Sequence, residues 1–201
     1  GNDATSDGVF VYTGTTPQTV AVGDTVQLTA NVKEFGTAPN TLTELDAVTG
    51  FSKCGTALVV KPVQISAPFN DLERFEGMLV TYPGTLTITD NFPYGRYGEL
   101  GLSATGRQFN PTNGNSATLP GTAELLANRI VLDDGRANQN PNPLAYVSGA
   151  NTRRTGDTVT GLTGTLHYAN GAFKVEPVGT VPFVEANPQP VSYTHLRAHE
   201  T

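Results

Sequence analysis

Short stretches in which apolar and polar residues alternate with a period of two recur along the chain. The clearest spans residues 26–32 (VQLTANV), where four apolar side chains alternate with three polar ones and so share one face of a half-buried strand. Residues 41–45 (TLTEL) follow a turn and are the expected hairpin partner of that strand. Residues 8–12 (GVFVY) form an apolar run between turn-forming segments, which predicts a buried strand. Further strands are predicted at 57–65, with Pro62 marking an edge or a bulge, and at 78–88 and 130–132.

Helical patterns are confined to two short segments. Residues 70–77 (NDLERFEG) predict one or two helical turns, because Asn70 or Asp71 can cap the first turn and Gly77 can end the last. Residues 122–128 predict a second short helix, and residues 94–98 (YGRYG) predict an aromatic loop. The pattern as a whole predicts an all-β fold with one or two short helices.

A repeated motif divides the chain into two β modules. Residues 156–163 (GDTVTGLT) match residues 23–29 (GDTVQLT) with one residue inserted, and each copy leads to a glycine-containing hairpin turn. Asn170-Gly171 is the strongest hairpin signal in the sequence. We expect one module at residues 1–66, too short for a complete barrel and lacking its opening strand upstream, and a second at residues 67–186.

The composition supports the β interpretation and limits the chemistry. The 201 residues include 29 threonines, 22 glycines and 14 prolines, and only 15% are charged. No apolar run approaches the length of a membrane span, so no membrane partner is expected. The net charge of −6 argues against a strongly basic nucleic-acid binder, and the single Cys54 excludes an internal disulfide and a cysteine-rich zinc site.

The C-terminal residues differ in character from the rest. Residues 187–201 are expected to be a linker followed by a tail, and the tail (SYTHLRAHET, 192–201) resembles a translated sequencing adapter, which makes a non-native origin the favoured interpretation over an ordinary C-terminus. Two of the three histidines, His195 and His199, lie in this tail. Any secretion signal is expected to lie upstream or to have been removed, because no Met-plus-apolar leader opens the chain.

The sequence contains no recognisable active site. Asp133 and Asp134 could bind calcium together, although Asp-Asp-Gly is equally an ordinary turn, and the turn interpretation is favoured. His167 has no acid or nucleophile placed near it by the sequence and is expected to be a surface strand residue. Cys54 has no base near it. Phosphate-binding loops, nucleophile elbows and zinc-protease motifs are all absent from the sequence.

Aromatic and arginine residues offer a better case for binding. Bases can stack on aromatic rings while arginines contact phosphates. The alternative is that aromatics such as Phe10, Tyr12, Phe35 and Phe173 fill the core of a small barrel. The loop at 94–97 is the expected exposed contact. The candidate nucleic-acid-binding residues are Tyr94, Arg96, Tyr97, Arg107, Arg153 and Arg154.

Several of these segments, taken in order, resemble a known family. They are SDGVFVYTG, VAVGDTVQLTANVKEFG, NRIVLDDG, GDTVTGLTGTLHYANGAFKVEP and, most specifically, residues 72–113. The series is similar to the region that precedes the catalytic domain in ExeM/NucH-type bacterial extracellular endonucleases, and its first part is similar to their YhcR-type OB-fold module. The resemblance covers nearly all of residues 1–190 and implies two OB-like small β-barrel modules, the first incomplete at its N-terminus.

The resemblance also implies a function for the chain. The catalytic domain of the parent nuclease would begin after residue 190, and calcium or magnesium would serve that domain rather than this fragment. The leading hypothesis is a non-catalytic region of a secreted bacterial endonuclease, with DNA or another nucleic acid and its own C-terminal catalytic domain as partners. The first alternative is a structural or cell-surface β module that binds no nucleic acid. The second is a stand-alone calcium-dependent hydrolase that uses Asp133 and Asp134.

Overall fold

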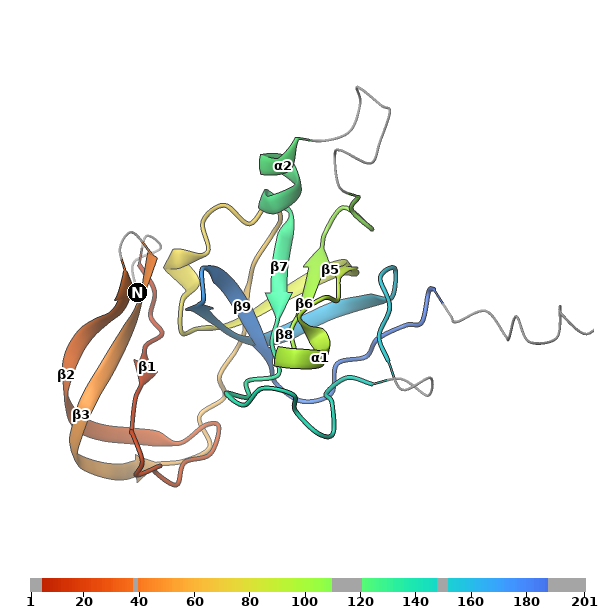
Figure 1. The fold of residues 1–201 in the computed structure, drawn as a ribbon. Coiled ribbons are helices and arrows are strands. Elements are labelled where there is room, and N and C mark those ends of the chain that lie inside the picture. The colour runs from red at the N-terminus through yellow and green to blue at the C-terminus, as the bar shows by residue number, and fades with distance from the viewer. Residues whose placement is uncertain (1–4, 38–39, 110–120, 148–151, 188–201) are drawn as a thin grey trace, which may run out of the picture.

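A computed structural model of the chain describes residues 5–37, 40–109, 121–147 and 152–187. Two sheets account for most of this structure, a three-stranded sheet near the N-terminus and a six-stranded sheet that closes on itself (Figure 1). The prediction of an all-β fold with barrel character and short helices is therefore confirmed. No helix in the described ranges has the length and apolarity needed to cross a membrane.

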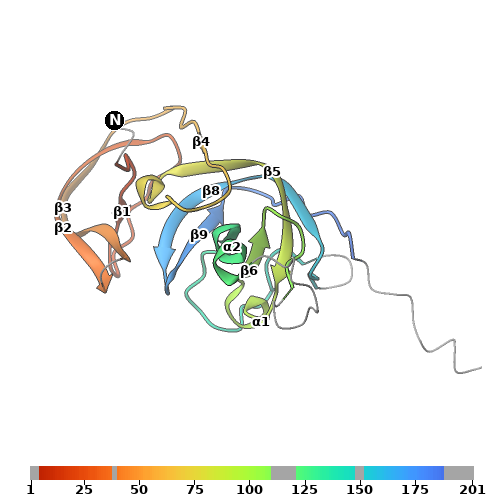
Figure 2. The same ribbon diagram turned by 90° about the horizontal axis from the view of Figure 1, so that it is seen from above.

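The N-terminal sheet is built on a long hairpin. β2 (Thr25–Thr37) and β3 (Asn40–Gly55) pair antiparallel, and the short β1 (Phe10–Val11) adds to β3 in parallel, in the order β1-β3-β2. The hairpin predicted from residues 26–32 and 41–45 is confirmed, with Val32 opposite Leu45. The three strands form an open sheet, which lies to one side of the barrel (Figures 1 and 2).

Burial in this sheet differs from the prediction. The strand at residues 8–12 is not buried, since Phe10 is 42% and Tyr12 is 53% exposed. Phe35 is also exposed, so these three rings do not fill a core, whereas Phe173 does pack against the barrel core. The reason is that one face of a sheet becomes dry only when a second layer covers it. In the described residues the barrel module contacts β3 near Thr43 and Glu44, where Glu44 is buried, and this contact leaves the rings of Phe10, Tyr12 and Phe35 exposed.

The second sheet is a barrel. The strand order is β4-β5-β6-β7-β9-β8, and a further pairing of β5 with β8 closes five of the strands. β7 and β9 are parallel, and the other pairs within the closed barrel are antiparallel. A closed five-stranded barrel of this kind belongs to the OB-like architecture, and closure removes exposed sheet edges. The strands are β4 (Val63–Gln64), β5 (Leu79–Asp90), β6 (Leu100–Ser103), β7 (Arg129–Leu132), β8 (Thr158–Ala169) and β9 (Ala172–Pro177).

Most strand predictions within the barrel hold, and one does not. Of the strand predicted at 57–65, only Val63–Gln64 forms, because Pro62 lacks the N–H that a ladder needs. β4 pairs with β5 in parallel at the edge of the six-stranded sheet, so this sheet begins at Val63, before the expected module boundary at residue 66. The hairpin at Asn170-Gly171 is confirmed, with φ angles of 53° and 83° that are typical of a type I′ turn.

Three short helical elements connect the strands. η1 (Glu73–Phe75) is a single 3₁₀ turn, as expected, but it begins after Leu72 without a side-chain cap, so the predicted capping by Asn70 or Asp71 is wrong. α2 (Thr122–Ala127) confirms the second predicted helix. The predicted aromatic loop is instead one helical turn, α1 (Tyr94–Tyr97), which ends at Gly98 with φ 74°.

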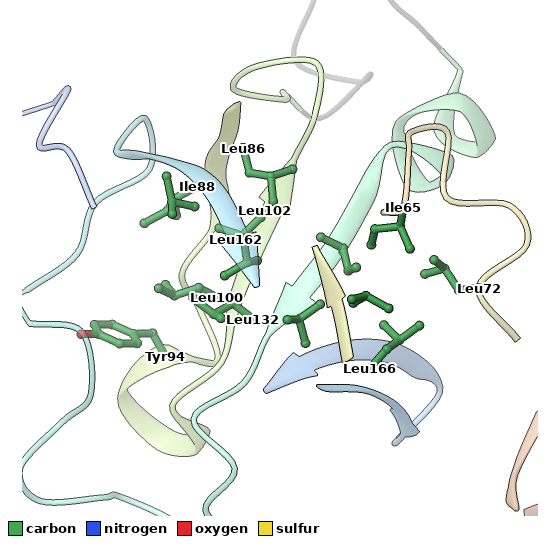
Figure 3. Close-up of a cluster of buried hydrophobic side chains, with 14 residues drawn as sticks. Ile65, Leu72, Leu86, Ile88, Tyr94, Leu100, Leu102, Leu132, Leu162 and Leu166 are labelled. Carbon is green, nitrogen blue, oxygen red and sulfur yellow. The ribbon is translucent and has the colours of Figure 1, made fainter. Parts of the chain in front are cut away.

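The hydrophobic core lies inside the barrel. Leucine, isoleucine and valine side chains from β5 to β9 meet there, with Ile65 and Leu72 at one end and Tyr94 at the edge, its hydroxyl directed away from the cluster (Figure 3). Full burial of each such aliphatic side chain contributes about 1.5–3 kcal/mol. The completely buried members include Leu86, Ile88, Leu100, Leu102, Leu132 and Leu166. This rigid core fixes the positions of the side chains that point outward from the same strands.

Candidate functional site

An ion pair crosses the outer face of the barrel above the short strand β6. Asp90 ends β5 and Arg129 begins β7, so both flank β6, and Arg129 Nη2 lies 3.1 Å from Asp90 Oδ2. Gly101 of β6 lies beneath them: a Cβ there would stand 2.7 Å from Arg129 Nη2 and 2.8 Å from Asp90 Cβ. The absence of a side chain at position 101 therefore lets the two charges meet.

The pair forms part of the lining of an open groove of about 360 Å³. Leu125 and Thr122 of α2 form one side, and the segment that follows β6 forms another. The side chains of Asp90 and Arg129 remain 41% and 31% exposed, so both are accessible from the groove. The lining residues are Thr89, Asp90, Gln108, Phe109, Thr122, Leu125, Leu126 and Arg129.

Gln108 anchors the segment that carries Phe109. Its backbone N–H donates to Thr89 Oγ1 at 2.9 Å, and the Thr89 hydroxyl donates to the Gln108 carbonyl at 3.3 Å. The Gln108 side-chain amide donates to the Leu125 carbonyl at 2.8 Å, which ties this segment to the end of α2. Phe109 is thereby held at the groove with 58% of its surface exposed.

Two exposed arginine–aromatic pairs lie near the two ends of β6, one in the helical turn α1 before it and one in the segment after it. The guanidinium of Arg107 lies over the ring of Phe109, with its Cζ 5.0 Å from the ring centroid. Arg96 lies over Tyr97 in the same way at 5.4 Å and donates to Gln139 Oε1 at 3.1 Å. The predicted candidates Arg96, Tyr97 and Arg107 are thus exposed, and each takes part in a cation–π contact of the kind that can also support base stacking.

Tyr94 does not belong to this exposed set. It is 4% exposed, and its hydroxyl donates to the Ala145 carbonyl. Burial raises the pKa of the Tyr94 phenol to about 12, with the charge of Asp134 adding to the rise and that of Arg153 opposing it. The prediction that Tyr94 is an exposed contact is wrong, because the helical turn of α1 directs this ring toward the core while Tyr97 faces solvent.

Arg153 is also a structural residue. It is 8% exposed, its Nε donates to the Tyr146 carbonyl, and its guanidinium lies 4.8 Å from the centroid of the Phe183 ring. Asp157 lies 3.8 Å from its Nη1. The side chain of Arg153, which was predicted to contact nucleic acid, is therefore buried and engaged by groups of the protein itself. Its neighbour Arg154 is half-buried, and its backbone N–H donates to Asp157 Oδ2 at 3.1 Å, away from the groove lining.

The carboxylates of the Asp133–Asp134 turn are engaged by groups of the protein itself. Asp133 Oδ2 accepts from the buried Lys174 Nζ at 2.9 Å, and its Oδ1 accepts from the Gly135 N–H at 3.0 Å. Asp134 Oδ1 accepts from the Arg136 N–H at 3.0 Å. Within the described ranges no three His, Cys, Asp or Glu side chains are grouped so as to hold a metal ion. These bonds are those of an Asp-Asp-Gly turn, and the calcium hypothesis for the two residues is not supported.

Lys174 of β9 forms a buried charge cluster with Glu99 and with Asp133 of the same turn. Burial would lower the pKa of Lys174, but hydrogen bonds to Glu99 and Asp133 outweigh it, and the pKa is raised. His167 of β8 lies with Nε2 3.3 Å from Oε1 of Glu176 on the adjacent β9, as expected for a strand residue. Cys54 is an exposed free thiol on the N-terminal sheet.

The residues at the base of the groove were not predicted from the sequence. Asp90 and Arg129 lie 39 positions apart and become neighbours only because β6 separates β5 from β7. One signal was present: Gly101 is an isolated glycine within a short strand, which can mark a close approach of other groups.

Comparisons with models of protein families, with curated proteins and with solved structures found no match to this chain.

Proposed function

We propose that the barrel is a non-catalytic module that binds single-stranded nucleic acid in the groove between α2 and the Phe109 segment. The observation that carries this proposal is an exposed ring, Phe109, held by its neighbours beside a half-exposed arginine, Arg129. Base–aromatic stacking contributes about 1–3 kcal/mol per base. The strands and loops of OB-like barrels are a common location for such binding.

The charges favour contacts with bases over contacts with a long phosphate backbone. The chain carries a net charge of −6, and several cations of the barrel are paired with carboxylates. Arg96 and Arg107 lie instead over exposed rings, where they can contact one or two phosphates beside a stacked base. The pairs are Arg74–Asp71, Arg129–Asp90, Arg136–Asp134, Arg153–Asp157 and Lys174–Glu99.

The wider biological role in this proposal comes from the family resemblance of residues 72–113. On that basis the module is extracellular and presents a strand to a metal-dependent nuclease domain of the same polypeptide, and calcium or magnesium acts in that domain. The alternative, a structural or cell-surface module, is supported by the net charge of −6. It predicts that the chain binds no nucleic acid.

The test is a fluorescence-anisotropy titration of the whole chain with single-stranded and duplex DNA, at low salt, with and without calcium. We expect single strands to bind more tightly than duplex, and Phe109→Ala to weaken single-strand binding about tenfold, the loss of one stacking contact. Phe35→Ala is a matched control, because Phe35 is also 58% exposed and also lies under a cation, Lys33. Affinity weaker than about 100 μM in every condition would favour the structural module, since even non-specific binders reach this range.

A further inference from the structure

We propose that the Asp90–Arg129 pair makes the groove selective for a guanine base of the bound strand. This inference rests on the proposed function and adds to it the identity of the preferred base. It is carried by the positions of Asp90, whose carboxylate only accepts hydrogen bonds, and Arg129, whose guanidinium only donates them. Both side chains are half-exposed and line the groove with the exposed ring of Phe109.

The carboxylate of Asp90 is held in place and keeps unused acceptor capacity. Its Oδ1 accepts from the Phe92 N–H at 2.9 Å and its Oδ2 accepts from Arg129 at 3.1 Å. Each carboxylate oxygen has two acceptor sites, so each can accept one more hydrogen bond from a ligand. The two bonds already present orient the carboxylate, so a ligand meets a preorganised acceptor.

Arg129 supplies donors next to this acceptor. The guanidinium carries five N–H groups in a rigid plane, and one of its terminal nitrogens is engaged by Asp90. Because Gly101 leaves the space above β6 open, carboxylate and guanidinium lie side by side on the outer face of the barrel. A ligand edge that presents adjacent donors followed by an acceptor complements this arrangement.

Guanine fits this requirement best among the four bases. Its Watson–Crick edge presents the N1–H and N2–H₂ donors beside the O6 acceptor, so Asp90 can accept twice while Arg129 donates to O6. Adenine and cytosine each offer one amino group to the carboxylate and present an acceptor nitrogen where guanine presents its second donor. Thymine offers one N–H between two carbonyl groups, one of which would face the carboxylate.

The groove suits one unpaired nucleoside. Its volume of about 360 Å³ lies at the small end of the ~300–1,000 Å³ range of ligand sites. Phe109 supplies a stacking surface beside the pair, and Leu125 supplies an apolar wall. Since the Watson–Crick edge is used, the base has to be unpaired, which is consistent with binding of single strands.

The test compares short oligothymidylates that carry one central guanine, adenine, cytosine or hypoxanthine, titrated against the whole chain. We expect the guanine strand to bind about tenfold more tightly than the adenine strand, within the discrimination usual for one bidentate contact. Hypoxanthine lacks the 2-amino group and should bind with intermediate affinity. Asp90→Asn and Arg129→Gln should bring the ratio of guanine-strand to adenine-strand affinity close to one, whereas Phe109→Ala should weaken the binding of every strand alike, because it removes the stacking surface and not the hydrogen-bonding pair.

Half-exposed ion pairs add little to stability, so both variants are expected to fold, and circular dichroism checks this. Equal affinity of the wild-type chain for all four strands, or a preference for another base, would overturn the guanine assignment and leave the stacking module standing. A guanine preference that survives in Asp90→Asn would also overturn it. Absence of binding to every strand would overturn the proposed function itself.

Discussion

Lys174 is buried in β9 and donates a hydrogen bond to Asp133 at the end of β7, with Nζ 2.9 Å from Oδ2. The same ammonium group binds Glu99, so one cation serves two carboxylates. Removing one member of a buried charge cluster leaves its partners desolvated and uncompensated. The stability of this side of the barrel therefore depends on all three groups being present together.

We expect Lys174→Met to lower the free energy of unfolding by about 3–5 kcal/mol, because Asp133 and Glu99 would lose their counter-charge. Urea denaturation followed by circular dichroism measures the change. Arg74→Met is the control, since Arg74 pairs with Asp71 at 3.2 Å and the two side chains are 40% and 72% exposed, so its loss should matter much less. Equal effects of the two substitutions would show that the Lys174 cluster adds nothing beyond a surface pair.

Glu76 makes the stability depend on pH. It is 5% exposed; its Oε2 accepts from the Thr43 N–H at 3.2 Å, and its Oε1 has no hydrogen-bond partner in the described structure. Burial raises its pKa above the ordinary 4.5, the nearby Glu73 and Glu34 add to the rise, and the backbone N–H groups of Thr43 and Tyr168 oppose it without cancelling it. A carboxyl with a raised pKa in the folded state contributes stability that is complete below the ordinary pKa and is lost as pH rises through the raised value.

Glu76→Gln should therefore raise the free energy of unfolding at neutral pH, by an amount on the order of 1 kcal/mol, the scale of one unsatisfied buried group. The gain should vanish at acid pH, where the native carboxyl is already protonated. Denaturation curves of both proteins across this pH range provide the measurement. A gain of the same size at acid and neutral pH would contradict the assignment of the effect to ionisation.

Tyr94→Phe should lower the free energy of unfolding by about 1 kcal/mol through loss of the hydrogen bond to the Ala145 carbonyl. It should also remove one phenol that ionises near pH 12 from an ultraviolet titration of the tyrosines. Binding of single-stranded DNA should be unchanged, because this ring is in the core. A loss of DNA binding without a loss of stability would instead show that Tyr94 belongs to the binding surface.

Gly101→Ala should weaken binding in the groove, because the new methyl group would stand too close to both Arg129 and Asp90. Relief of this crowding should cost about 1–3 kcal/mol of stability. Gly95→Ala in α1 is the control: a Cβ there meets no atom within 4 Å. The two variants are compared by thermal unfolding and by oligonucleotide titration, and unchanged values for Gly101→Ala would show that the ion pair does not require the open glycine surface.

Local patterns were reliable where one short segment decides its own structure. The hairpin at Asn170-Gly171 forms because both turn residues accept positive φ, and the alternation in residues 26–32 does produce a strand. The same patterns did not determine burial. Leu28 is half-buried, but Val32 on the same nominal face is 74% exposed, because burial depends on what covers the sheet.

The sequence by itself determined that this protein is an all-β chain with a repeated strand–hairpin motif, because glycine, asparagine and β-branched residues act through local backbone preferences. Only the tertiary structure decided which arginines are free to act at the surface. Arg107 and Arg153 look alike in the sequence, yet the first lies over the exposed Phe109 and the second is buried against Phe183. The strand order β5-β6-β7 likewise brings Asp90 and Arg129 together across β6, and no local pattern encodes a contact between strands that are not neighbours along the chain.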